Sequence, residues 1–185
     1  YINNNLEKKS HPPPPEIWLK NGTYNHTIEK ITIPIIIMGC GKNTTIIENS
    51  LVFRIKSCYS KYKSILYDIG ITSKKGDWVN KCQHGIECWN DSKINIYSCK
   101  IFNCYGNGIS SKDSNTNIYN SEIYNNDSSG IHIWGNTVFK FKNIFIHHNN
   151  DGIMMGSVKK SNQCIINNIV CQYNKRGGIL LGGWE

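Results

Sequence analysis

The chain contains an internal repeat with a step of about 22 to 26 residues. Five Gly-Ile dipeptides follow one another at intervals of 23, 22, 22 and 26 residues. The pairs begin at Gly85, Gly108, Gly130, Gly152 and Gly178. Self-similarity at a short fixed period is typical of folds in which one small unit stacks on the next. The repeat therefore restricts the fold more than any other feature of the sequence.

Three further rows of residues follow the same step. One polar row consists of Ser98, Asn120, Asn143 and Asn168. A second row consists of Cys104, Asn126, Asn149 and Asn174. An apolar row between them consists of Ile101, Ile123, Ile146 and Cys171. Because the rows share one register, we expect equivalent residues to lie above each other. The two sets of asparagines then form hydrogen-bonded ladders, and the isoleucines form a buried column. Each glycine of the Gly-Ile pairs is expected at a turn with positive φ.

Composition indicates that the repeating unit is built from strands. The 185 residues include 30 Ile and 25 Asn but no Ala. Ile favours strands, whereas Ala is the best helix former. Ankyrin and tetratricopeptide units need helices, and leucine-rich repeats need Leu. A parallel β-helix fits best, with three short strands in each coil and coils about 4.8 Å apart. No apolar run approaches the roughly 20 residues of a membrane span.

Several segments resemble the coils of a known family, the right-handed parallel β-helix repeats. The similarity is to pectin-lyase-like proteins, and especially to NosD-like or carbohydrate-binding and sugar-hydrolase repeats. The segments that carry it are 94–104, 118–126 and 143–149, with 21–24 and 31–47 nearer the N-terminus. The resemblance implies an all-β, right-handed solenoid of about seven coils of 22–23 residues. We expect a polar, Pro-rich arm at 1–16 and one domain at 17–185, with regular coils over 85–185.

Charge and cysteine content give further expectations about partners. The formal net charge is +8, but the lysines are scattered, and an AT-rich coding sequence alone would produce such an excess. Nucleic acid is therefore not the expected partner. The eight cysteines show no CxxC pair and no zinc-ligand spacing, so no metal centre is expected. Buried thiols are favoured, and the disulfide state is left open. Since the first residue is Tyr1, we expect a fragment or a processed product.

Strand alternation places a group of aromatic and charged residues on one outer face. If the Gly-Ile isoleucines point inward, the residues one and three positions later point outward. Tryptophan on a shallow surface suits stacking against a sugar ring, and polar neighbours suit its hydroxyl groups. The residues expected to bind a ligand, such as a glycan, are Trp89, Lys112, His132 and Trp134. An ordinary solvated face is the alternative interpretation.

The same face contains weak candidates for catalysis, namely Glu87, Asp91, Asp113 and His132. Asp91 and Asp113 are expected about one coil apart, near 5 Å, which suits a retaining glycosidase pair or a Ca²⁺ site. Two turn-forming aspartates are the alternative. His147 and His148 should alternate between faces, so they are not expected to share a metal.

A partial motif of the hydrolases is also present. Asn150-Asp151-Gly152-Ile153 resembles part of the polygalacturonase-type motif, but Met154 stands where that family has a second acid. No complete hydrolase, lyase or epimerase set is found. The resemblance therefore favours a non-catalytic structural or surface module, as in a virion, another assembly or an extracellular protein, with glycan binding in addition. Protein neighbours, in a homo-oligomer or larger assembly, are expected to cover the open C-terminal coil. The alternative is a polysaccharide-acting enzyme of the pectin-lyase-like superfamily.

Overall fold

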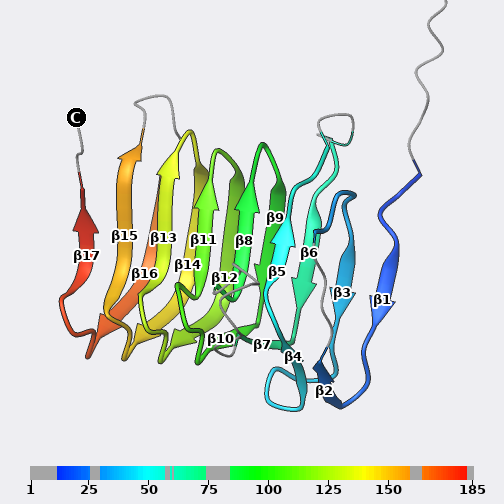
Figure 1. Cartoon of the computed structure of the whole chain (residues 1–185), viewed down its shortest axis with the longest axis horizontal. Coiled ribbons are helices and arrows are strands. Elements are labelled where there is room, and N and C mark those ends of the chain that lie inside the picture. The colour runs from blue at the N-terminus through cyan, green and yellow to red at the C-terminus, as the bar shows by residue number, and fades with distance from the viewer. Residues whose placement is uncertain are drawn as a thin grey trace, which may run out of the picture.

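The computed structural model describes residues 12–25, 30–56, 59, 61–73, 84–158 and 164–182. These residues form 17 strands, and every pair of hydrogen-bonded strands is parallel. The chain winds as a coil, so that strands far apart in sequence lie side by side along one axis (Figure 1). The expected fold class, an all-β parallel solenoid, is confirmed. Of the expected arm at 1–16, residues 1–11 lie outside the described part of the chain.

Each coil contributes to three faces, which we number in the order in which the chain passes them. Face 1 contains β1 (Glu16–Trp18), β3 (Ile36–Met38), β6 (Ser64–Tyr67) and β9 (Lys93–Tyr97). Face 2 contains β2 (Gly22–Asn25), β4 (Thr45–Glu48), β7 (Gly70–Thr72) and β10 (Lys100–Phe102). Three long strands contribute to both faces: β12 (Asn115–Tyr124), β14 (Val138–His147) and β16 (Cys164–Gln172). Face 3 contains β5 (Leu51–Phe53), β8 (Ile86–Trp89), β11 (Ile109–Lys112), β13 (Ser129–Gly135), β15 (Asp151–Val158) and β17 (Gly177–Leu181).

The core consists of apolar columns in the predicted register. On face 2, Ile101 pairs with Ile71 and Ile123, and the column continues through Ile146 to Cys171. On face 3, the isoleucines of the five Gly-Ile pairs that begin at Gly85 are aligned from β8 to β17. Side chains in the middle of these columns are fully buried, and burial of this apolar area stabilises the coil. The six described cysteines are free, and three are buried in the same core: Cys88, Cys99 and Cys104.

The sequence had predicted left-handed backbone at the glycines of the Gly-Ile pairs, and this prediction is wrong. Instead the left-handed positions lie at the three corners of the coil, and most of these residues are Asn, Asp or Ser, which tolerate that conformation. The corner after face 3 has positive φ at Asn90, Asp91, Asp113 and Gly135. The corner between faces 1 and 2 has positive φ at Asp68, Ser98, Asn120, Asn143 and Asn168. The corner after face 2 has positive φ at Asn103, Asn125, His148 and Tyr173.

The repeated glycines are required because a side chain at these positions would collide with the next coil. A Cβ added at Gly108 would lie 2.7 Å from the Gly130 carbonyl oxygen and 2.8 Å from the amide nitrogen of Asn126. A Cβ at Gly130 would lie 2.7 Å from Ile146 and 3.0 Å from the amide nitrogen of Asn149. At these two positions, successive coils are therefore too close for a side chain where a glycine faces an asparagine of the next coil.

Candidate functional site

Two outer surfaces of the coil carry chemically distinctive side chains, and the first is the outer side of face 3. The strand register aligns Lys112 with Trp89 on one side and with Trp134 on the other. It also aligns Ser110 with Glu87 and with His132. The sequence-predicted residues of this face are therefore neighbours in space.

Cations cover the tryptophan rings of this face. The Arg54 guanidinium carbon lies 3.7 Å from the centroid of Trp89, and Lys112 Nζ lies 5.8 Å from the same ring. Lys112 Nζ lies 4.9 Å from Trp134, whose ring also stacks on His132 at 5.2 Å. These contacts are cation–π and ring-stacking interactions within the protein. Arg54 Nη1 and the Nε1 atoms of both tryptophans are buried without a hydrogen-bond partner.

Sequence reasoning missed Arg54 as a member of this surface. Leu51 pairs with Ile86 and Phe53 with Cys88, so Arg54 takes the position that Trp89 has in the next coil. The alignment was not visible because the coil of β5 lacks a Gly-Ile pair and has Ser50 before Leu51. Arg54 also lies 3.8 Å from the carboxylate of Glu87, which is 5% exposed.

The carboxylates of the predicted catalytic group have other contacts. Asp113 Oδ1 accepts a hydrogen bond of 2.7 Å from the backbone N–H of Asn136, in the next coil. The Asp91 backbone N–H donates to the Asp113 carbonyl oxygen at 2.6 Å, so these two turns do stack. The Asp113 carboxylate, however, contacts the following turn. Burial lowers the pKa of His132, and the charge of Asp151 opposes that shift.

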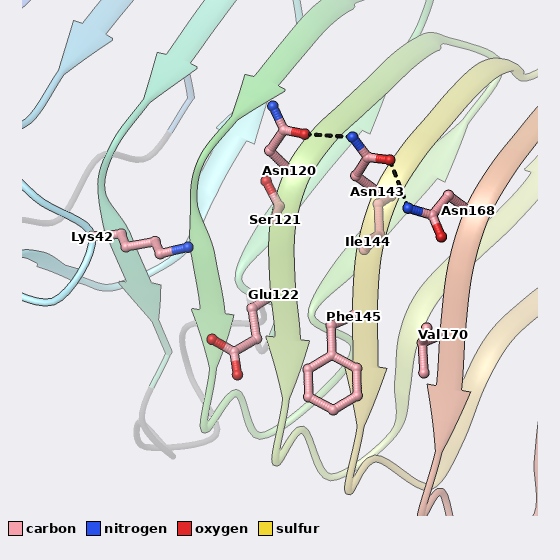
Figure 2. Close-up of a pocket in the computed structure, with 9 residues that line it drawn as sticks. All are labelled: Lys42, Asn120, Ser121, Glu122, Asn143, Ile144, Phe145, Asn168 and Val170. Atoms are coloured by element: carbon pink, nitrogen blue, oxygen red, sulfur yellow. Dashed lines mark hydrogen bonds between the residues drawn. The ribbon is translucent and has the colours of Figure 1, made fainter.

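The second surface is a shallow groove of about 510 Å³ on the outer side of face 2 (Figure 2). Three exposed amides follow its upper edge: Asn168 donates to Asn143, and Asn143 donates to Asn120, each at 2.9 Å. Below them lie Glu122, Phe145 and Val170 on successive strands (Figure 2). The side chain of Lys42 points toward the groove from the side of the N-terminal coils (Figure 2). No part of this groove was singled out by the sequence except its asparagines.

Each exposed amide has hydrogen-bonding capacity left over. A primary amide offers two N–H donors and two acceptor lone pairs, and Asn143 uses one of each within the row. The remaining donor and lone pair are accessible from solvent. The row therefore presents at least one free donor and one free acceptor per coil to a ligand that follows the axis.

Asn126, Asn149 and Asn174 form an inner row at the corner after face 2, in which the first two are buried and Asn174 is half-buried. Asn126 Nδ2 donates to Asn149 Oδ1 at 2.8 Å, and Asn149 Nδ2 donates to Asn174 Oδ1 at 3.1 Å. Each side chain also accepts from a backbone N–H of the preceding coil and donates to a backbone carbonyl, at 3.0–3.5 Å. This row satisfies polar backbone groups that the corner would otherwise leave unpaired in the core.

A charged cluster lies beside the groove. Glu122 forms an ion pair with Lys100 at 3.3 Å, and its other oxygen lies 3.1 Å from His147 Nε2. Burial tends to raise the pKa of Glu122, but the hydrogen bonds and charges of His147 and Lys100 outweigh it and lower that pKa. A carboxyl group held in its ionised form is poorly suited to act as a general acid. The ring of His147 stacks on Tyr124, which stacks on Phe102.

The expectation that His147 and His148 point to opposite sides is wrong. Their Nδ1 atoms are 2.7 Å apart. Simple alternation fails because His148 has a φ of 54°, so the strand does not continue through it. Among the described residues, no group of three or more His, Cys, Asp or Glu is arranged to hold a metal ion. No described helix is long and apolar enough to cross a membrane.

Comparisons with known proteins agree with this geometry. The family model described as the right handed beta helix region matches residues 84–183, which is more than half of the chain. The chain belongs to the right-handed β-helix family. The family assignment thereby confirms the handedness that the sequence resemblance implied.

One solved structure is similar over most of the chain, ORF18 of Geobacillus virus E2. The alignment has 20% sequence identity and a TM-score of 0.58, and it covers 83% of this chain. It covers only 33% of the viral protein, so this β-helix spans about a third of that protein's length. At this identity the similarity shows the shared fold. The search of curated proteins gave no match.

Proposed function

We propose that this β-helix is a non-catalytic module of a virion-associated or other surface assembly, and that it binds an extended saccharide in the groove on face 2. The groove's row of exposed amides is the observation that carries the proposal. The similarity to a protein of a bacterial virus supports the assembly context.

The groove matches an extended saccharide in both chemistry and repeat. A sugar offers hydroxyl groups, each of which donates and accepts, and the row of amides offers one donor and one acceptor per coil. Coils are about 4.8 Å apart, which is close to the length of one pyranose unit in an extended chain. Glu122 and Lys42 add charged hydrogen-bonding partners, and the ring of Phe145 adds an apolar surface for a sugar face (Figure 2).

The contacts of the carboxylates favour binding over catalysis. A glycosidase needs two carboxyl groups that face the same glycosidic bond, one of them kept protonated. In the described chain, Glu87 is next to Arg54, Glu122 is bound by Lys100 and His147, and Asp113 accepts from a backbone N–H. All three carboxylates are therefore engaged by groups of the protein itself, and the pKa of Glu122 is lowered by His147 and Lys100.

We also propose a protein neighbour at the C-terminal coil. Inward columns of faces 1 and 3 end there, and side chains that are buried in other coils are exposed in β16 and β17. Ile166 is 40% exposed, Ile179 46% and Leu181 79%. An exposed strand edge with apolar side chains favours a further strand or coil stacked upon it. We infer a homo-oligomer or a larger assembly, in which light scattering would measure a mass above that of one chain.

A binding screen with two matched variants tests the saccharide proposal. Oligosaccharides on an array identify ligands, and calorimetry then measures the affinity of the best one. Asn143→Gly removes the central amide at a position where the backbone favours glycine, and we expect at least a tenfold loss of affinity. Trp134→Leu changes face 3 and should leave binding unchanged.

The reverse pattern decides between the two surfaces. Loss of binding in Trp134→Leu, with Asn143→Gly unaffected, would assign the ligand to Trp89, Lys112, His132 and Trp134 on face 3. A reducing-end assay on the same oligosaccharides tests the enzyme alternative. Turnover that Asp113→Asn abolishes would overturn the non-catalytic proposal.

A further inference from the structure

Two adjacent histidine rings converge beside the groove. His147 ends β14, and His148 follows it in the left-handed conformation, with a φ of 54°. The rings are nearly perpendicular, with centroids 5.0 Å apart, and the two Nδ1 atoms are 2.7 Å apart. Two nitrogen atoms at this distance share one proton in a hydrogen bond, or they share a cation.

Glu122 determines which nitrogen of His147 carries the proton. Glu122 Oε1 lies 3.1 Å from His147 Nε2, and its other oxygen is paired with Lys100 at 3.3 Å. An ionised carboxylate only accepts hydrogen bonds, so Nε2 carries the proton. In the neutral ring Nδ1 then has a free lone pair, directed at His148. Metal-ligating histidines often donate their other ring N–H to a carboxylate, because this hydrogen bond fixes the tautomer and the orientation of the ring.

His148 is able to provide the second lone pair. Its ring is exposed, so the proton on Nδ1 can exchange through water to Nε2 without any protein group having to move. Both Nδ1 atoms, 2.7 Å apart, can then offer a lone pair to one cation. We propose that His147 and His148 form a binding site for Cu²⁺, with water completing the coordination.

The spacing of the two nitrogens selects the metal. Imidazole nitrogen binds metals at about 2.0–2.1 Å, so two ligands at a right angle lie about 2.9 Å apart and two tetrahedral ligands about 3.3 Å apart. The observed 2.7 Å is closer to the right angle of a square-planar or tetragonal site. That geometry is typical of Cu²⁺ or Ni²⁺ with nitrogen and oxygen ligands, and Cu²⁺ binds most tightly in the divalent series.

Titration of the tag-free protein with Cu²⁺ tests the proposal. The exposed thiols of Cys40 and Cys164 are alkylated beforehand, and glycine serves as a competing ligand. We expect one Cu²⁺ per chain with a tetragonal electron paramagnetic resonance spectrum that shows coupling to two nitrogens. His148→Gln should weaken binding at least tenfold, while the matched variant His132→Gln on face 3 should bind as the unchanged protein does. Equal affinity in His148→Gln and the unchanged protein would overturn the proposal, as would equal losses in both variants.

A second pair of variants tests the positioning role of Glu122. Glu122→Leu removes the acceptor behind His147 and should weaken Cu²⁺ binding by about 10- to 100-fold. Glu122→Gln keeps an oxygen that can accept from Nε2, so it should restore most of the affinity. Thermal melts without metal establish that each variant folds. If Glu122→Leu folds and binds Cu²⁺ as tightly as the unchanged protein, the assigned role of Glu122 is wrong.

Discussion

The substitution Asn149→Ala should destabilise the coil much more than the removal of an exposed amide from the other row. Asn149 is fully buried, and its Oδ1 accepts from both the backbone N–H and the side-chain amide of Asn126, at 3.1 and 2.8 Å. Its Nδ2 donates to the carbonyl oxygens of Ile123 and His147. The variant leaves the Asn126 N–H without an acceptor in the core and weakens the bonding of its amide.

The size of the effect follows from these orphaned groups. A buried donor without a partner costs about 1–3 kcal/mol, so two affected donors cost about 4 kcal/mol in the free energy of unfolding. For a chain of this length, that corresponds to a fall of roughly 8–16 °C in melting temperature. Asn143→Gly removes one exposed amide from a left-handed position that suits glycine, and it should cost less than about 1 kcal/mol. Denaturant unfolding followed by circular dichroism measures both variants. A difference between them below about 1 kcal/mol would refute the assignment of the inner row as a structural requirement.

Three further measurements test the packing, the pH dependence and the thiols. Gly130→Ala should cost about 1–3 kcal/mol because the new Cβ would lie 2.7 Å from Ile146, whereas Gly156→Ala, with 3.6 Å to its nearest neighbour, should be tolerated; equal melting temperatures would contradict the spatial argument. Burial, assisted by the charge of His132, lowers the pKa of His84 to about 4 from 6.5. Between these two values the unfolded chain binds a proton that the folded chain does not, so stability should fall as the pH falls from about 6.5 to 4 and level off below. His84→Gln should lose this part of the pH dependence, and an unchanged slope would count against it. Burial raises the pKa of Cys99 to about 12, so a thiol reagent should modify exposed Cys164 rapidly and Cys99 only after unfolding; fast labelling of Cys99 in the folded protein would show that this corner opens.

The sequence predicts the fold because the repeat places equivalent residues in register. Once Ile101, Ile123 and Ile146 are recognised as one column, their hydrogen-bonded strands and their burial follow from strand geometry. The glycine prediction failed for a physical reason. A glycine is needed either for backbone freedom or for space, and the sequence does not distinguish the two. At Gly108 the requirement is space against the next coil.

The surfaces are harder to predict than the core. A column gives the side of the sheet on which a residue lies, but not which neighbour covers it. Arg54 lies over Trp89 although the repeat is not recognisable in its coil. The convergence of His147 and His148 did have a signal, since His148 occupies the same position in the repeat as Asn103 and Asn125. Asparagine at that corner in two successive coils indicates a left-handed residue, and such a residue interrupts the alternation of the strand.

Departures from a repeated column therefore indicate where one coil has a role of its own. Asparagine adopts the left-handed conformation at low cost, and a bulkier side chain there loses that advantage. His148 replaces asparagine at such a corner, and its neighbour His147 continues an aromatic column that Phe102 and Tyr124 begin. The ring of His148 lies 5.4 Å from that of Tyr173, which takes the same corner in the next coil, so ring contacts account for part of its role. Imidazole also provides chemistry that neither an amide nor a phenol provides at this corner, and the proposed binding of a transition metal by two adjacent rings is such chemistry.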